Sequence, residues 1–111
     1  MNNEIIWLED EKPLMDENES LFTANGLTIL KCTTSTQALK YVIDGNKKNI
    51  LLDLEFPNST RDGLLFLEQI QKIKKDLNVV ILTGKPKLKE AIRLVNEGKV
   101  KDYLEKPIPD D

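Results

Sequence analysis

The chain has 111 residues, 40% of them hydrophobic and 32% charged, a balance typical of one soluble globular domain with a single core. Its 16 basic and 19 acidic residues are mixed along the sequence and give a formal net charge of -3, so no basic surface for nucleic acid is expected. The single cysteine excludes an internal disulfide, and the absence of histidine excludes the usual zinc sites and all catalytic histidines.

Short apolar runs alternate along the chain with segments of helical periodicity. Strands are predicted at about 4–8, 27–32, 49–53, 78–83 and 101–104. This alternation is typical of a parallel sheet with right-handed crossovers and helices on both faces. The sequence therefore predicts a single α/β domain over residues 1–111.

The first two helices have recognisable ends. The first is predicted to start at Pro13, which suits the first helical position, and to end at Asn25-Gly26, where glycine can take a left-handed cap conformation. The second follows Thr34, which forms a predicted capping box with Gln37, and ends at Gly45. Their apolar stripes are Leu14, Leu21 and Phe22 in the first helix and Leu39, Val42 and Ile43 in the second.

Two further helices are predicted after the third and fourth strands. The third begins near Asp62 or Gly63, and the fourth lies between Pro86 and Gly98. The residues expected to face the core are Phe66, Ile70 and Ile73 in the third helix and Leu88, Ala91, Ile92 and Val95 in the fourth. Trp7 and Cys32 are assigned to the core as well, and the acidic stretch 16–19 to a solvated helix face.

The apolar runs are too short to cross a membrane. They reach about four residues, as in 79–82, whereas a membrane-spanning helix needs roughly 20. The segment 1–4 lacks the basic region and long apolar stretch of a signal peptide. We therefore expect a cytoplasmic protein without a membrane segment, which the single cysteine also favours.

Acidic residues stand where two predicted strands end. Asp53 ends the third strand, and the cluster 9–11 follows the first strand. An apolar strand seldom ends in an acid for packing reasons, and the carboxyl ends of parallel strands meet at one edge of the sheet. Close carboxylates raise one another's pKa unless a cation holds them, and oxygen ligands without nitrogen or sulfur favour Mg²⁺ or Mn²⁺.

Two other polar residues are predicted at the same edge, namely Thr83 and Lys106. Asp53 can act as a nucleophile toward an activated phosphoryl group and form an acyl phosphate. The ammonium of Lys106 and a cation would neutralise the transferring oxygens, and the Thr83 hydroxyl could donate a hydrogen bond to one of them. Such chemistry needs no histidine on the acceptor side.

Five segments in order resemble the receiver domain of two-component response regulators, the CheY-like superfamily. They are 5–11 (IIWLEDE), 51–57 (LLDLEFP), 62–63 (DG), 80–84 (VILTG) and 102–107 (DYLEKP). The resemblance extends through Pro109. It implies a flavodoxin-like three-layer sandwich whose five parallel strands have the order 2-1-3-4-5.

The resemblance also implies a role for each site residue. Asp53 is expected to be the phosphoacceptor, Lys106 the clamp on the phosphoryl group, Thr83 the switch hydroxyl and Tyr103 the aromatic residue whose rotamer follows it. The ligands of Mg²⁺ would be Glu9, Asp10, Asp53 and the backbone carbonyl of Glu55, with Asp10 a direct ligand. The Lys106–Pro107 peptide would be cis.

By the same resemblance the chain is a signalling domain rather than an ordinary enzyme. A histidine kinase or phosphotransfer protein would donate the phosphoryl group to Asp53, and the change would be transmitted to a protein-binding surface. Glu55 and Lys85 stand two positions after the acceptor and the switch threonine, where residues of the family modulate the lifetime of the phosphoryl group. Removal of either charge is expected to change the dephosphorylation rate.

The sequence departs from the family pattern at two places, the loop beside Asp53 and the segment after Pro107. The segment 58–61 lengthens the loop beside Asp53, which could gate access to the site. Only four residues follow Pro107, too few for the fifth helix of the family. We expect the resulting bare flank near the fourth helix and fifth strand, with apolar groups of the first and fifth strands, to support self-association or docking of a partner.

Other interpretations remain open from the sequence. Residues 9–11 alone could be a polar loop, and Asp53 alone could cap a helix or a turn. A degenerate receiver that serves only as an interaction or dimerisation module is the main alternative, against which Asp10, Asp53, Thr83 and Lys106 argue. A phosphatase of the haloacid dehalogenase type would need an aspartate where Glu55 stands.

Overall fold

The computed structural model describes residues 4–44, 49–55, 60–74, 76–84 and 87–106, and only the backbone at positions 60 and 61. The strands are β1 (Glu4–Leu8), β2 (Thr28–Cys32), β3 (Asn49–Asp53), β4 (Asn78–Thr83) and β5 (Asp102–Glu105). The helices are α1 (Lys12–Ala24), α2 (Ser35–Ile43), α3 (Thr60–Ile73) and α4 (Leu88–Asn96). The predicted strands are thus confirmed to within one residue at each end.

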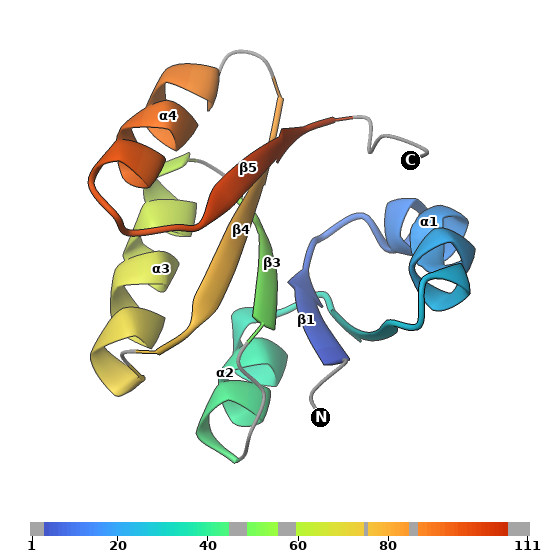
Figure 1. Cartoon of the computed structure of the whole chain (residues 1–111). Coiled ribbons are helices and arrows are strands. Elements are labelled where there is room, and N and C mark those ends of the chain that lie inside the picture. Colours follow the sequence, from blue (N-terminus) through green and yellow to red (C-terminus); the bar gives the residue numbers. More distant parts are fainter. Residues whose placement is uncertain (1–3, 45–48, 56–59, 75, 85–86, 107–111) are drawn as a thin grey trace.

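All strand pairs are parallel, and the sheet has the order β2-β1-β3-β4-β5. Figure 1 shows α2, α3 and α4 on one side of the sheet and α1 on the other. The expected three-layer, flavodoxin-like arrangement is confirmed. Parallel strands end at a common edge, so this order brings the carboxyl ends of β1, β3, β4 and β5 together.

Side chains of each strand alternate between the two faces, as the pleat requires. Ile6 and Leu8 of β1 belong to the core beneath α2, α3 and α4, whereas Trp7 belongs to the core beneath α1. The Trp7 ring lies 5.6 Å from that of Phe22 in α1, centroid to centroid. Trp7 and Cys32 are both fully buried, which confirms their assignment to the core.

The predicted start of α2 is confirmed in detail. The Thr34 hydroxyl accepts a hydrogen bond from the Gln37 amide at 3.2 Å, and the Gln37 side chain accepts one from the Thr34 amide at 3.2 Å. This capping box satisfies donors that the first helical turn leaves free. The predicted helix signals Gly45 and Pro86 lie outside the described residues.

Three apolar residues expected to face the core are exposed instead, and those expectations were wrong. Ile43 and Ile73 are 61% and 43% exposed, and each is the last residue of its helix, where fewer neighbours surround a side chain. Ile92 is 40% exposed because α4 buries Ala91 and Leu94, and one residue turns a helix by about 100°.

The acidic stretch in α1 also does more than face solvent. Asp16 and Glu19 accept hydrogen bonds from the ammonium of Lys31 on β2 at 2.9 and 2.8 Å. The Lys31 and Lys12 ammonium groups lower the pKa of the Asp16 carboxyl. These exposed ion pairs connect α1 to the edge strand β2, and such pairs typically contribute less than about 1 kcal/mol each.

The α1 face of the sheet has a hollow of about 250 Å³. Its apolar lining comes from Ile5, Phe22, Ile50, Leu51, Val80 and Leu104, and its polar lining from Asn49 and Asn78. Among the described helices only α1 covers this face, since α4 packs on the opposite one. Of the two elements named for the predicted bare flank, β5 therefore borders the hollow and α4 does not.

No helix in the described part of the chain is both long enough and apolar enough to span a membrane.

Candidate functional site

Backbone hydrogen bonds extend the sheet by one residue beyond two of its strands. The Glu9 amide donates to the Cys32 carbonyl at 3.0 Å, and the Lys106 amide donates to the Thr83 carbonyl at 2.8 Å. Glu9 and Lys106 are therefore held in the sheet although each follows the last residue of its strand. This is how the edge acquires fixed charged side chains.

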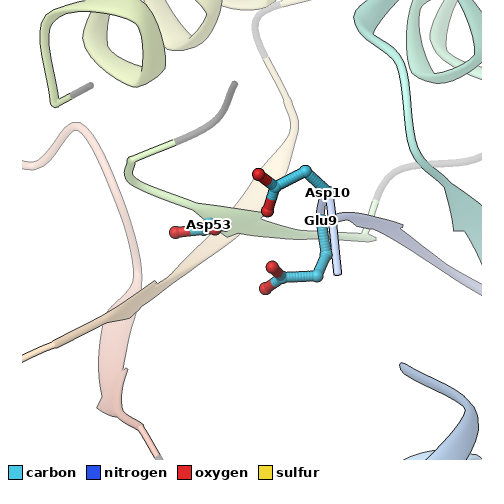
Figure 2. Close-up of side chains that lie close together, drawn as sticks. All are labelled: Glu9, Asp10 and Asp53. Carbon is cyan, nitrogen blue, oxygen red and sulfur yellow. The ribbon is translucent and has the colours of Figure 1, made fainter. Parts of the chain in front are cut away.

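Three carboxylates converge at this edge, as Figure 2 shows. One oxygen from each of Glu9, Asp10 and Asp53 lies within 4.8 Å of the other two. Glu9 is fully buried and Asp53 is 4% exposed, whereas Asp10 is exposed. The predicted meeting of these acids at one edge is borne out, with Asp10 on the solvent side.

The ammonium of Lys106 partly balances this negative charge. Its Nζ lies 3.3 Å from Oε1 of Glu9 and 3.4 Å from Oδ2 of Asp53. Burial acts to lower the pKa of Lys106, but the charges of Asp53 and Glu9 outweigh burial and raise that pKa above its usual value. Lys106 is therefore a fixed cation between the two buried acids.

One ammonium does not compensate for three carboxylates. Burial and the neighbouring charge of Asp53 raise the pKa of Glu9 to about 8, although Lys106 and the Glu11 amide act in the opposite direction. Oε1 of Glu9 is buried and accepts no hydrogen bond from the described residues, despite its ion pair with Lys106. The cluster thus has an excess of negative charge that a cation would neutralise.

The donor atoms suit a hard divalent cation. Glu9, Asp10 and Asp53 offer only carboxylate oxygens, without nitrogen or sulfur ligands, a set that favours Mg²⁺ or Mn²⁺. The residues present therefore fit such an ion.

The two oxygens of Asp53 have different partners. Oδ2 faces Lys106, and Oδ1 accepts a hydrogen bond from the backbone amide of Glu55 at 3.0 Å. The amide of the intervening Leu54 donates to the Leu82 carbonyl of β4 at 3.1 Å. The turn after β3 therefore holds the carboxylate in one orientation.

Thr83 ends β4 at the same edge and is fully buried. Among the described residues, the hydrogen bond of its hydroxyl goes to the Gly84 carbonyl at 3.0 Å. Tyr103 pairs with Ile81 across the sheet and packs, partly buried, against the core on the α4 side. Glu55 has an exposed side chain. Lys85, Pro107 and the loop residues 56–59 lie outside the described residues.

Two features of the site have no role predicted from the sequence: the ion pair of Glu9 with Lys106 and the glycine at position 63. Gly63 is buried in the first turn of α3, and its backbone lies against that of Leu54. A glycine inside a helix is a usable signal, since it is unfavourable there unless close packing requires it.

A family model described as the response regulator receiver domain matches residues 5–111. An NtrX-like response regulator of Rickettsia bellii is 28% identical over 108 residues, which cover 97% of this chain and 22% of that protein. The response regulator MprA of Mycobacterium ulcerans is 24% identical, covering 96% of this chain and 45% of that protein. The chain therefore spans less than half the length of these relatives.

Solved structures agree with these matches. The receiver domain of NtrX from Brucella abortus superimposes with a TM-score of 0.83 at 26% identity, covering 96% of this chain and 88% of that one. A receiver domain protein from Clostridium thermocellum gives a TM-score of 0.80 at 28% identity, with coverages of 96% and 84%.

Proposed function

This chain belongs to the response regulator receiver domain family, and on that premise we propose that residues 1–111 form one receiver domain whose phosphoacceptor is Asp53. The observation that carries the proposal is the convergence of three carboxylates within 4.8 Å, two of which form ion pairs with the ammonium of Lys106. An acid cluster of this kind, fixed at the carboxyl edge of a parallel sheet, suits phosphoryl transfer better than it suits packing.

The donor would be a phosphohistidine of a histidine kinase or of a phosphotransfer protein. An oxygen of Asp53 attacks the phosphorus; the O–P bond forms as the P–N bond breaks, and the imidazole leaves with the electron pair and takes a proton from solvent. Lys106, 3.4 Å from Oδ2, lies where it can neutralise charge on the transferring oxygens. In the return reaction, water cleaves the acyl phosphate and restores the free carboxylate.

Glu9, Asp10 and Asp53 would hold Mg²⁺ or Mn²⁺, together with the backbone carbonyl of Glu55. The ion would supply charge neutralisation for the phosphoryl oxygens. Glu9 contributes a buried oxygen that accepts no hydrogen bond from the described residues, and Asp10 contributes an exposed carboxylate on the solvent side. Lys106, whose Nζ already lies 3.4 Å from Oδ2 of Asp53, would supply the second positive charge beside the phosphoacceptor.

Thr83 and Tyr103 would transmit the phosphorylated state. The Thr83 hydroxyl, bonded to the Gly84 carbonyl, would exchange that acceptor for a phosphoryl oxygen. The movement would open space for the Tyr103 ring at the junction of β5 and α4. Glu55 and Lys85 would then modulate the lifetime of the acyl phosphate, as their positions in the sequence suggest.

Beryllofluoride, which mimics a phosphoryl group on an aspartate, tests this function. With Mg²⁺ present it should change the fluorescence of Trp7, two residues from Glu9, and the change should disappear with EDTA or in Asp53→Asn. An Asp44→Asn control, at the exposed acid that directly follows α2 as its C-cap, should respond like the wild type. No response in the wild type would contradict the proposal.

A second candidate function is a receiver that works as an interaction module independently of phosphorylation. The apolar hollow on the α1 face favours it, because soluble proteins rarely leave apolar surface open without a use. Under this alternative, self-association or docking of a partner would occur with and without Mg²⁺ and beryllofluoride alike.

A further inference from the structure

Gly63 stands where a helix ordinarily disfavours glycine. It is the fourth residue of α3, and glycine in a helix costs about 1 kcal/mol relative to alanine. Gly63 is buried, and its conformation requires no positive φ. The reason for a glycine must therefore lie in what its Cα touches.

The neighbour of Gly63 is the backbone of Leu54, the residue directly after Asp53. A Cβ added to Gly63 would lie 2.6 Å from the Leu54 carbonyl carbon and would overlap its oxygen. Carbon atoms in contact prefer separations of about 3.5–4.0 Å. No side-chain rearrangement can relieve this overlap, since the Cβ is fixed to the backbone at position 63 and the atoms that it meets are backbone atoms of Leu54.

The Leu54 carbonyl belongs to the same planar peptide as the Glu55 amide. That amide donates the 3.0 Å hydrogen bond to Oδ1 of Asp53. On the other side of Leu54, its own amide is held by the Leu82 carbonyl of β4 at 3.1 Å. A Cβ at position 63 would push against the Leu54 carbonyl, tilt the plane of the peptide and move the Glu55 N–H away from Oδ1 of Asp53.

We infer that Gly63 is a positioning residue for the phosphoacceptor: because it has no side chain, α3 packs directly against the Leu54–Glu55 peptide without displacing it, and this peptide fixes the orientation of the Asp53 carboxylate. The inference rests on the proposed function, because it concerns how well Asp53 is presented for phosphoryl transfer. With Oδ1 held by the amide, Oδ2 is the oxygen that faces Lys106. The Glu55 carbonyl, proposed as a cation ligand, belongs to the next peptide of the chain, which is joined to this one at the Glu55 Cα.

Gly63→Ala tests the inference, with Gly98→Ala as the matched control. Gly98 has φ +75°, so alanine there is strained as well, but it follows α4 and a Cβ would meet no neighbour. In folded protein with Mg²⁺ and acetyl phosphate, Gly63→Ala should form acyl phosphate about tenfold more slowly or worse, and Gly98→Ala within about twofold of wild type. An unchanged rate in folded Gly63→Ala would overturn the inference.

Amide NMR supplies a readout that a purely structural role would not move. In folded Gly63→Ala the Glu55 amide proton should shift upfield, as expected when its hydrogen bond to Asp53 is lost, whereas Gly98→Ala should leave it in place. Should Gly63→Ala fail to fold, Asp53→Ala in the native chain serves instead. Removing the carboxylate should move the resonances of both Glu55 and Gly63, and a Gly63 resonance that stays fixed would contradict the coupling.

The two failures can be told apart. If wild-type protein forms no acyl phosphate, the proposed function fails, and the NMR shifts still decide whether Gly63 controls the Asp53 orientation. If the wild type reacts and Gly63→Ala reacts equally well, only the positioning role fails.

Discussion

Glu9 shows why the edge of the sheet is more than a polar loop. The side chain is fully buried, its carboxyl has a pKa raised to about 8, and its Oε1 forms an ion pair with Lys106 but accepts no hydrogen bond within the described part of the chain. A buried acid in this state reduces folding stability unless something neutralises it. Natural proteins keep such groups at functional sites, where binding repays the loss.

Replacing Glu9 with glutamine should therefore stabilise the protein while weakening cation binding. The unfolded chain loses its Glu9 proton near pH 4.5, but the folded protein holds it up to about pH 8. As the pH rises between these two values, the free energy of unfolding of the wild type falls, because the unfolded chain releases a proton that the folded protein keeps. The difference in the free energy of unfolding between Glu9→Gln and the wild type is therefore absent below pH 4.5 and grows toward pH 8. Urea unfolding at pH 7 in EDTA should show a gain of about 1–3 kcal/mol.

The controls for Glu9→Gln are the addition of Mg²⁺ and a second Glu→Gln substitution at an exposed position. Mg²⁺ should stabilise the wild type and have a smaller effect on Glu9→Gln, because one ligand has lost its charge. Glu17→Gln, an exposed acid in α1, should change neither property. A loss of stability in Glu9→Gln at pH 7 would mean that the glutamate charge is well compensated in the folded protein.

The position of the site residues along the chain could be predicted because each follows an apolar run. Asp53 and Thr83 end β3 and β4, and the parallel order brings these ends together. The orientation of the Asp53 carboxylate could not be predicted. It depends on a backbone contact between Gly63 and Leu54, which arises only when α3 packs on the sheet.

Helix α2 shows that local sequence patterns predict the start of a helix better than they predict which of its side chains are buried. Thr34 and Gln37 predict the capping box, and the structure contains both of its hydrogen bonds. Burial along the same helix was not predicted correctly, because Ile43 at the last position is exposed although its spacing matches the core stripe. Capping is a contact within one turn, whereas burial depends on where the neighbouring elements end.

Thr34→Ala should lower the free energy of unfolding by about 1 kcal/mol, since it leaves the Gln37 amide without its acceptor. Thr36, exposed on the same helix, provides the control, and Thr36→Ala should be neutral or slightly stabilising because alanine has the higher helix propensity. Urea unfolding monitored by circular dichroism measures both. Equal effects of the two substitutions would show that the cap contributes nothing specific.

For the whole molecule, the main asymmetry is between the two faces of the sheet. Three helices cover one face, and on the other the described residues leave a hollow of about 250 Å³ beside α1. Its lining residue Leu51 stands two positions before Asp53 on β3, and its lining residue Leu104 on β5 stands two positions before Lys106, which directly follows that strand. A molecule docked in this hollow would therefore contact the strands that carry the site.

Self-association through the hollow predicts a difference between two substitutions to lysine. Val80→Lys places a charge in the hollow and should abolish concentration-dependent association, whereas Ile92→Lys, on the exposed side of α4 across the sheet, should not. Sedimentation equilibrium of the three proteins measures this. The opposite result would assign the contact to α4, and a strictly monomeric wild type would contradict self-association.

We propose that Asp53 accepts a phosphoryl group with the help of Glu9, Asp10 and Lys106. The most direct measurement is the intact mass of the protein after incubation with acetyl phosphate. With Mg²⁺ the wild type should gain the mass of one phosphoryl group, lose it again under alkaline conditions that hydrolyse acyl phosphates, and gain nothing in EDTA or as Asp53→Asn. Phosphorylation that persists in Asp53→Asn, or a wild type that gains no mass with Mg²⁺, would contradict the claim.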